Sequence, residues 1–274
     1  MQCSIFLFSL FAFASTAKAY ESPLDKLIDL YKSASEKKEK NNNKKENKIE
    51  NALIPGEKNQ SQKSEKNSKQ QKRVPQVVTD PKEIEKAAEF AANATGVRKE
   101  FIMGMLVVES NLGRNPGECT YQEVADGAQE SYENGRLSST AWQTFQSRQE
   151  IIVELADDLG YDYHQLKVSC NPGAAYAGTG GALGVPQFMP DTWLEYKDRI
   201  GEIVGKENPD PWDVQDGAVA MALKLSDVWG VTSHSTLAER NAAKIYLSGT
   251  TSWQYDWYAN KILYWAQNYS QLLG

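Results

Sequence analysis

Apolar residues in the C-terminal two-thirds of the chain recur every three or four positions, the period of an amphipathic helix. The first helix is expected to start at Asp80-Pro81, with Asp80 as N-cap, Pro81 in its first turn, and Glu83 completing a capping box. It should end before Gly96. Similar start and stop signals predict further helices at about 98–110, 139–159, 214–229, 237–247 and 254–272. Strand-type alternation is scarce, so the fold is expected to be mainly α.

The N-terminus has the pattern of an export signal. A short apolar run at 4–13 is followed by Ala17-Lys18-Ala19, a small-residue cleavage site. The run is too short to span a bilayer, so we interpret 1–19 as a signal peptide, although no Lys or Arg precedes it. The alternative is an uncleaved anchor or a buried first helix. Export would place the protein in the periplasm, in the cell wall or outside the cell.

The segment at 20–75 is a low-complexity linker, with one possible short amphipathic helix at 22–31. It is rich in Lys, Asn, Glu, Gln and Ser, a composition that cannot bury enough apolar surface to offset the entropy of ordering. The linker is basic although the whole chain has a formal charge of −6. Interleaved Glu residues and missing aromatic residues argue against nucleic-acid binding. Residues 76–274 form the predicted folded domain.

The chain has three cysteines, which bear on whether it forms a disulfide or binds a metal. Signal cleavage would remove Cys3 and leave Cys119 and Cys170, which in an exported protein suggest a disulfide. The alternative is a pair of buried free thiols. Only two histidines are present, and no compact Cys/His spacing indicates a metal site. We therefore expect neither a metal nor a cofactor.

Glu109 is the residue whose position is most unusual for its type. Ile102, Met105 and Leu106 precede it by seven, four and three residues, so all four lie on one helical stripe. Burial would raise the pKa of a carboxyl group there and keep it protonated near neutrality, as a general acid requires. The alternative is a Glu at the edge of the stripe that pairs with an Arg or Lys.

Four motifs, in order, resemble those of the lytic transglycosylases. They are Val108-Glu109-Ser110-Asn111-Leu112-Gly113, Gly184-Val185-Pro186-Gln187-Phe188-Met189-Pro190, Ala243-Lys244-Ile245-Tyr246-Leu247-Ser248-Gly249 and Trp257-Tyr258-Ala259-Asn260-Lys261-Ile262-Leu263. Pro211-Trp212-Asp213 is similar to the branch typified by membrane-bound lytic transglycosylase B. The third motif lacks the usual Asn-Ala-Gly, and the segment at 118–181 is longer than the family pattern.

The resemblance implies a lysozyme-like domain of the goose-type or SLT kind that cleaves peptidoglycan. Glu109 would protonate the oxygen between N-acetylmuramic acid and N-acetylglucosamine, and the sugar's own N-acetyl group would assist. The same Glu would then deprotonate the 6-hydroxyl, which leaves a 1,6-anhydro end. A lysozyme-type hydrolase with a second carboxylate is the alternative, with four candidates: Glu118, Glu123, Asp126 and Asp191. An inactive wall-binding scaffold is the third possibility.

The resemblance also indicates substrate contacts. Ser110 would orient Glu109 or touch the substrate, unless it is simply a polar residue at the helix end. Gln187 suits recognition of an N-acetyl or hydroxyl group, because its amide both donates and accepts. Tyr246 would bond to Glu109 or to the N-acetyl group, unless it is a core residue; Tyr258 lies in the last motif, and Tyr176 is the best candidate for stacking on a sugar. We expect a monomer whose partner is the glycan strand, with envelope machinery as a further possible partner.

Overall fold

The computed structural model describes residues 72–78, 80–170 and 180–273. The chain divides into two units, Met1–Ile54 and Pro55–Gly274, and every described residue belongs to the second. The predicted signal peptide, most of the predicted linker with its short helix, and Tyr176 lie outside the described residues. None of the helices that are described has the length and hydropathy to cross a membrane.

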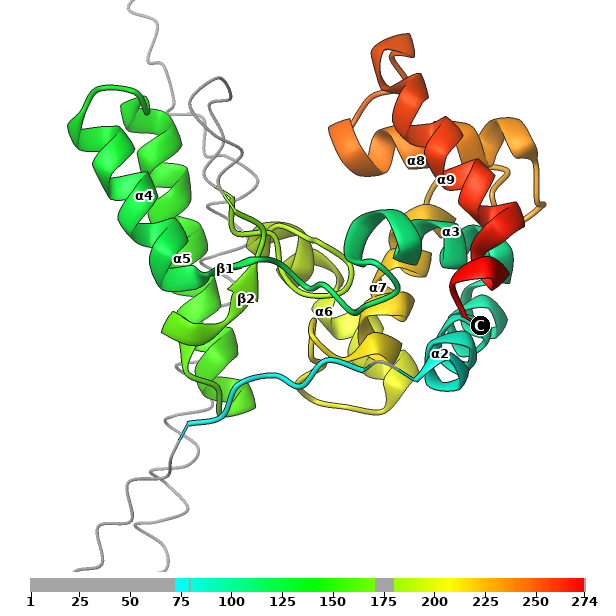
Figure 1. Ribbon diagram of the computed structural model, residues 1–274, viewed down its shortest axis with the longest axis horizontal. Coiled ribbons are helices and arrows are strands. Elements are labelled where there is room, and N and C mark those ends of the chain that lie inside the picture. Colours follow the sequence, from blue (N-terminus) through cyan, green and yellow to red (C-terminus); the bar gives the residue numbers. More distant parts are fainter. Residues whose placement is uncertain (1–71, 79, 171–179, 274) are drawn as a thin grey trace, which may run out of the picture. The chain divides into compact units, whose positions relative to one another are not determined.

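Helices dominate the described part, so the prediction of a mainly α fold is confirmed (Figure 1). The α-helices are α2 (Pro81–Thr95), α3 (Lys99–Ser110), α4 (Tyr121–Glu133), α5 (Ser139–Leu159), α6 (Pro190–Val204), α7 (Val214–Ser226), α8 (Thr236–Ser248) and α9 (Asp256–Asn268). Three short 3₁₀ helices are η1 (Tyr163–Gln165), η2 (Trp253–Tyr255) and η3 (Tyr269–Leu272). Two short strands, β1 (Cys119–Thr120) and β2 (Lys167–Val168), pair antiparallel.

The helix ends follow the sequence signals closely in α2, α3 and α5. Asp80 caps α2, but its carboxylate accepts from the backbone N–H of Lys82, so the capping box expected with Glu83 does not form. Helix α7 ends at Ser226, earlier than expected, and 3₁₀ turns take up both ends of the last predicted helix. Helices α4 and α6 were not predicted, although Pro190 and Gly205 mark the ends of α6.

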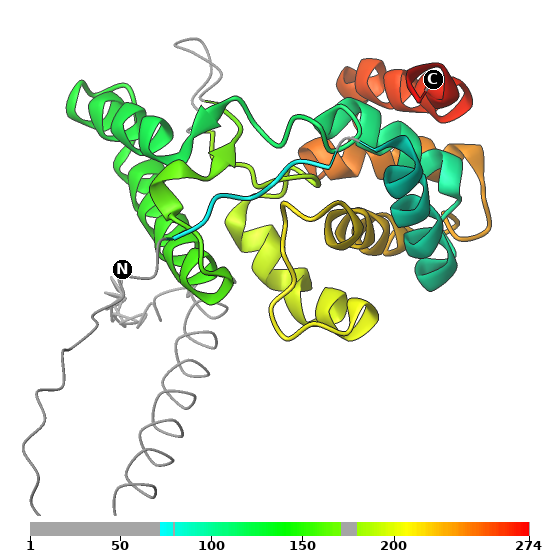
Figure 2. The same cartoon turned by 60° about the horizontal axis from the view of Figure 1, so that its bottom comes forward.

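Helix α3 lies at the centre of the core. Residues 101–106 are all buried, and α9 packs along one side of the helix (Figures 1 and 2). Gly104 allows this contact, because a Cβ at that position would lie 2.5 Å from the carbonyl oxygen of Ile262. Helix α2 packs on α7, α7 on α6, and α8 on α9. The close α3–α9 contact brings the end of α3 next to side chains from α9.

Between α3 and α6, helices α4 and α5 form a helical hairpin beside the paired strands β1 and β2. Helices α4 and α5 pack together, and the stacked rings of Tyr121 and Phe145 lie 6.2 Å apart in their interface. A disulfide joins Cys119 to Cys170 across Cα atoms 5.1 Å apart, which confirms the predicted pairing. Arg148 of α5 binds Asp191 of α6 through two hydrogen bonds of 2.9 and 3.0 Å. These contacts attach the hairpin to the rest of the domain.

Arg73 lies beside the end of α5, and the chain runs from there towards α2 (Figure 1). Arg73 accepts a backbone hydrogen bond from Asp162 and donates one to Gly160. A cavity of about 610 Å³ lies here, lined in part by Arg73, Tyr161 and Trp212. It contains none of the predicted site residues.

Candidate active site

Glu109 lies in the last turn of α3, where the chain changes direction sharply. Asn111, Leu112 and Gly113 follow with φ angles of 49°, 63° and 78° and end the helix. A left-handed conformation is costly for a branched residue such as Leu112, and such strain is often found at functional sites. The backbone N–H groups of Asn111 and Leu112 bind the carbonyls of Val107 and Leu106, at 3.2 and 2.8 Å. The turn therefore fixes the direction of the Glu109 side chain.

The Glu109 carboxyl is surrounded by protein on most sides, although part of its surface stays accessible. Burial raises its pKa to about 7; the hydrogen bond from Tyr258 and the charges of Lys224 and Lys261 act in the opposite direction. The Tyr258 hydroxyl donates to Oε1 of Glu109. No described residue donates a hydrogen bond to Oε2. A carboxyl group with a pKa near 7 and one oxygen unengaged suits proton transfer in either direction at neutral pH.

Tyr258 comes from α9 and is buried. Burial raises its pKa well above the usual value, and the charge of Glu109 acts in the same direction. Tyr258 therefore remains a hydrogen-bond donor at neutral pH. Its hydroxyl fixes one carboxyl oxygen and leaves the other available to a ligand.

Lys224 of α7 places its ammonium group over two aromatic rings. Its Nζ lies 4.8 Å from the ring centroid of Tyr246 and 5.1 Å from that of Phe188. No described residue lies within ion-pair or hydrogen-bond distance of this ammonium. Burial lowers the pKa of Lys224, and three carboxylates oppose that shift: Glu195, Glu109 and Asp191. The site thus contains a cation that interacts with Glu109 without a direct ion pair.

The motif at 184–190 forms a tight loop against the segment before α7. Gly184 has a φ of 54°, and a Cβ there would lie 2.0 Å from the carbonyl oxygen of Pro211. Gln187 also has a positive φ, and its amide nitrogen donates to the carbonyls of Pro116 and Gly184 at 2.9 and 2.7 Å. Both amide hydrogens are therefore engaged, and only the amide oxygen can receive a substrate donor.

Two predicted contacts are engaged within the protein. Ser110 is buried, and its hydroxyl accepts from the N–H of Gly113 at 3.1 Å. Tyr246 donates to the carbonyl of Pro186 at 2.5 Å and not to Glu109. Both hydroxyls therefore have a partner within the protein, and a contact of either residue with substrate stays a prediction. Of the two predicted tyrosines that the structure describes, Tyr246 and Tyr258, it is Tyr258 that bonds to Glu109.

The candidate second carboxylates lie in other environments. Asp191 pairs with Arg148, Glu123 accepts from Thr120 in the capping box of α4, and Asp126 accepts from Gln122. Glu118 is exposed. In the described part of the chain, the groups that alter the Glu109 pKa are a tyrosine and two lysines, and no carboxylate is among them.

The sequence interpretation missed Lys224. The clue is its place on α7, where the preceding residues from Asp216 to Leu223 are all buried. A cation on so apolar a helix is as anomalous as Glu109 on its stripe. Among the residues that the structure describes, no group of three His, Cys, Asp or Glu side chains could hold a metal ion.

Comparison with known proteins gives one family match. A family model described as the transglycosylase SLT domain matches residues 15–227. No curated protein sequence matches.

Similar solved structures include the Escherichia coli lytic transglycosylase Slt35 in two complexes. Its complex with bulgecin A is 17% identical and has a TM-score of 0.47, covering 72% of this chain and 76% of the other. Its complex with calcium is 17% identical with a TM-score of 0.48, covering 72% and 77%. A 36 kDa muramidase/transglycosylase gives the same values as the calcium complex.

Proposed function

The chain belongs to the transglycosylase SLT domain family, and on that premise we propose that Glu109 is its catalytic acid/base. The protein is a lytic transglycosylase with a lysozyme-like, mainly α fold, an enzyme that cleaves the glycan of peptidoglycan. The observation that carries the assignment of Glu109 is its environment. The carboxyl is desolvated, it holds one hydrogen bond from Tyr258, and its pKa is about 7.

In the first half of the reaction, protonated Glu109 donates to the glycosidic oxygen between N-acetylmuramic acid and N-acetylglucosamine. The bond from C1 to that oxygen breaks, and the carbonyl oxygen of the muramic N-acetyl group bonds to C1. Glu109 is left as a carboxylate, which the charge of Lys224 stabilises. Tyr258 keeps its hydrogen bond to Oε1, so Oε2 is the oxygen that transfers the proton.

In the second half, ionised Glu109 takes the proton from the 6-hydroxyl of the same muramic residue. The oxygen attacks C1, the bond to the N-acetyl oxygen breaks, and a 1,6-anhydro ring forms. The proton is back on Glu109 and no water has been consumed. A pKa of about 7 suits this cycle, because the group must first donate and then accept a proton.

A lysozyme-type hydrolase is the less favoured function. A retaining hydrolase places a second carboxylate roughly 5 Å from the acid. The described groups that shift the pKa of Glu109 are the Tyr258 hydroxyl and the ammonium groups of Lys224 and Lys261, and none of them is a carboxylate that could take that role.

The remaining site residues take supporting roles in this proposal. Tyr258 is a positioning residue that orients Glu109. Gln187 offers its amide oxygen to an N–H or hydroxyl group of the sugar, because its amide nitrogen is already bound to Pro116 and Gly184. Ser110 holds the turn after α3, and Tyr176 stacks on a sugar.

Lytic transglycosylases act on peptidoglycan in the periplasm or cell wall. We propose that this chain reaches that compartment through its signal peptide and acts there as a monomer. The disulfide between Cys119 and Cys170 supports an oxidising compartment.

Glu109→Gln tests the assignment. Glutamine keeps the shape and can accept the Tyr258 bond, but it cannot protonate a leaving oxygen, so solubilisation of purified peptidoglycan should fall at least about a hundredfold. Glu118→Gln is the matched control, because Glu118 is an exposed carboxylate nearby in the sequence, and this variant should keep normal activity. Normal activity of Glu109→Gln would show that the assignment is wrong.

A further inference from the structure

Two tryptophans close in sequence to Tyr258 are largely exposed. The Trp253 and Trp257 side chains, in η2 and the first turn of α9, are 78% and 62% exposed. Leaving large aromatic surfaces in water costs free energy, so adjacent exposed aromatic rings indicate a binding surface. Both residues lie outside 15–227, the part matched by the family model.

One of the two tryptophans, Trp257, contacts a residue of the Glu109 site. The ring of Trp257 meets the ring of Tyr258 edge to face, with centroids 5.7 Å apart and planes at 78°. The hydroxyl of Tyr258 in turn donates to Glu109. One aromatic contact therefore separates the exposed indole from the residue that orients the acid.

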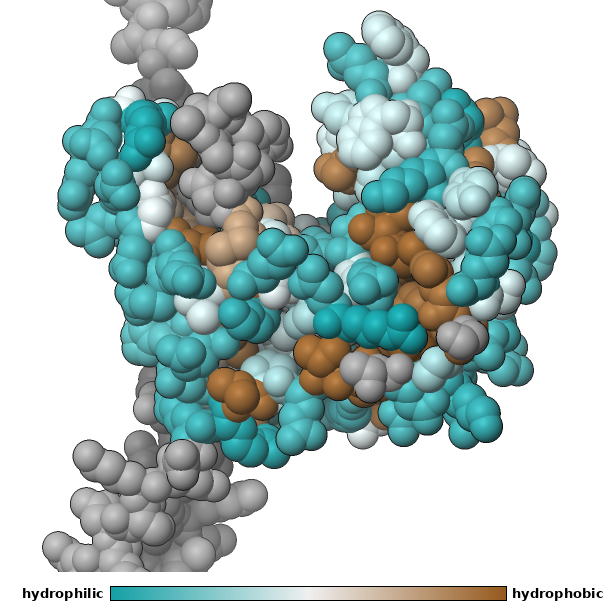
Figure 3. Space-filling view, in the orientation of Figure 1, coloured by the Kyte–Doolittle hydropathy of each residue, from teal (hydrophilic) through white to brown (hydrophobic). Residues whose placement is uncertain are grey.

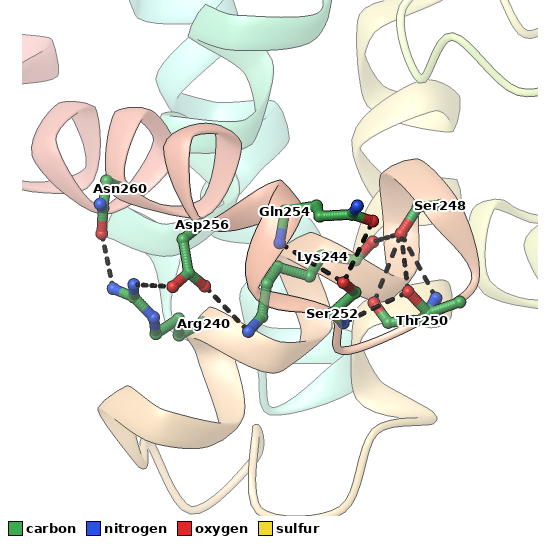
Figure 4. A network of polar contacts seen from close by, with 8 residues as sticks. All are labelled: Arg240, Lys244, Ser248, Thr250, Ser252, Gln254, Asp256 and Asn260. Atoms are coloured by element: carbon green, nitrogen blue, oxygen red, sulfur yellow. Dashed lines mark hydrogen bonds and ion pairs between the residues drawn. The ribbon is translucent and has the colours of Figure 1, made fainter.

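A polar network fixes the backbone that carries the two tryptophans (Figure 4). Asp256 lies between them in sequence and binds Lys244 and Arg240 of α8 at 3.0 and 3.1 Å. Arg240 also reaches Asn260 of α9 at 2.5 Å. The two cations hold the pKa of Asp256 below its usual value, with Lys244 the stronger influence. The start of α9 is thus tied to α8 before any ligand arrives, which reduces the entropy lost on binding.

Hydroxyl and amide groups continue this network on the other side of Trp253. Ser252 receives the backbone N–H of Gln254 and donates to the Gln254 side chain, both at 3.4 Å. Ser248 bonds to the Thr250 backbone and to the carbonyl of Lys244 (Figure 4). Groups that can bond to hydroxyls therefore lie on both sides of Trp253 in the sequence.

The chemistry of this surface fits a carbohydrate better than an apolar protein partner. Gln254, Asn260 and Lys261, close to the two tryptophans in sequence, are exposed, and the space-filling view shows mainly hydrophilic and intermediate residues, with a few hydrophobic ones, over α8 and α9 (Figure 3). A pyranose ring has one apolar C–H face and hydroxyl groups at its edges. An aromatic ring bordered by polar groups matches both features at once.

We propose that Trp253 and Trp257 form a saccharide-binding subsite, which holds glycan-strand sugars beyond those that react at Glu109. The subsite rests on the proposed function, because its ligand is the same strand. Its role is to hold the polymer by stacking while Glu109 acts on one bond. We refer to these two residues as the tryptophan platform.

Binding of a soluble glycan tests the platform apart from catalysis. The probe is a hexamer of β-1,4-linked N-acetylglucosamine, titrated calorimetrically into Glu109→Gln protein. Adding Trp253→Ala and Trp257→Ala together should weaken binding by about tenfold or more. Replacing both with Tyr should restore most of the affinity, because a ring remains in each position. Trp229→Ala, which removes a tryptophan that is 96% exposed elsewhere, should leave the affinity unchanged.

The double-tyrosine variant and the melting temperatures control for a folding defect, since both double variants should melt at the temperature of the parent Glu109→Gln protein. Unchanged hexamer affinity in the folded double-alanine protein would overturn the platform. So would unchanged affinity with lost self-association in sedimentation, because a second copy would then be the occupant. Neither result would bear on Glu109, which the loss of peptidoglycan cleavage in Glu109→Gln tests separately.

Discussion

Glu109 at the end of α3 and Asp216 at the start of α7 are both removed from bulk water, but their carboxyl groups differ in how many hydrogen-bond and ion-pair partners they have. Asp216 at the start of α7 is fully buried. Both its oxygens accept from Lys206 Nζ at 2.8 Å, and one also accepts the N–H of Asp210 at 2.8 Å. Glu109 at the end of α3 receives only the hydroxyl of Tyr258 from the described residues, and its lysine neighbours stay beyond ion-pair distance.

The difference separates a structural carboxylate from a chemical one. A buried charge that is paired and hydrogen-bonded is tolerated and holds neighbouring segments in place, as Asp216 holds the loop before α7. A buried carboxyl that lacks such partners keeps its proton near neutral pH, as Glu109 does. Burial therefore does not by itself single out a candidate catalytic residue; the candidate proposed here, Glu109, is the buried carboxyl that has fewer partners than Asp216.

Among the variants that test this comparison, the largest expected change in stability comes from replacing Asp216. Asp216→Asn replaces one acceptor with an NH₂ group that faces Lys206 or the Asp210 N–H, so the free energy of unfolding should fall by about 2–3 kcal/mol. Chemical denaturation measures it. Asp198→Asn, at an exposed position, should change stability by less than about 0.5 kcal/mol. Equal stability of the two variants would mean that the Asp216 cluster is not structural.

Glu109→Gln should change stability in the opposite direction. The folded pKa of about 7 lies above the unfolded value of 4.5, so the unfolded chain loses its proton first as pH rises. The wild-type protein therefore loses stability between those two values, and glutamine does not. Above pH 7 the variant should be more stable by on the order of 2 kcal/mol, and near pH 4 the two should agree. Denaturation curves at both pH values test this; a variant less stable than wild type above pH 7 would contradict it.

The smallest expected effect is a shift in pH dependence on removing the nearby cation. The charge of Lys224 lowers the pKa of Glu109, so Lys224→Met should raise that pKa. Because Glu109 must be protonated for the first step, the fall in activity on the alkaline side should move to higher pH. Lys224→Arg should keep the wild-type profile. Lys261→Met should shift it less, because Lys261 is exposed and its charge is better screened.

Local signals predicted much of the fold and part of the site. The N-cap Asp80 and the glycines after α2 and α5 gave those helix ends, and the two cysteines gave the disulfide. Helix α4 was not predicted because its sequence contains Gly127 and few apolar residues. Packing within the hairpin stabilises it instead. A cap signature alone is therefore not enough to predict a helix, because α4 begins with the complete Thr120–Glu123 capping box and was not predicted.

The site shows the same limit. The apolar stripe predicted that Glu109 would be unusual, but which tyrosine reaches it depends on how α9 packs on α3. Tyr246 turned out to bind Pro186, and Tyr258 to bind Glu109. The environment of Lys224 comes from Phe188 and Tyr246, far apart in sequence, so no local pattern could show it.

The most direct test of the central claim is the fate of solvent oxygen during cleavage. Purified peptidoglycan is digested in water enriched in heavy oxygen, and the new muramic ends are analysed by mass spectrometry, with Glu109→Gln as the blank. If Glu109 takes the proton of the 6-hydroxyl and that oxygen attacks C1, as proposed, the new ends made by the wild-type enzyme are anhydro and carry no label. The Glu109→Gln blank then shows almost no new ends. Labelled reducing ends would contradict the account and make the enzyme a hydrolase.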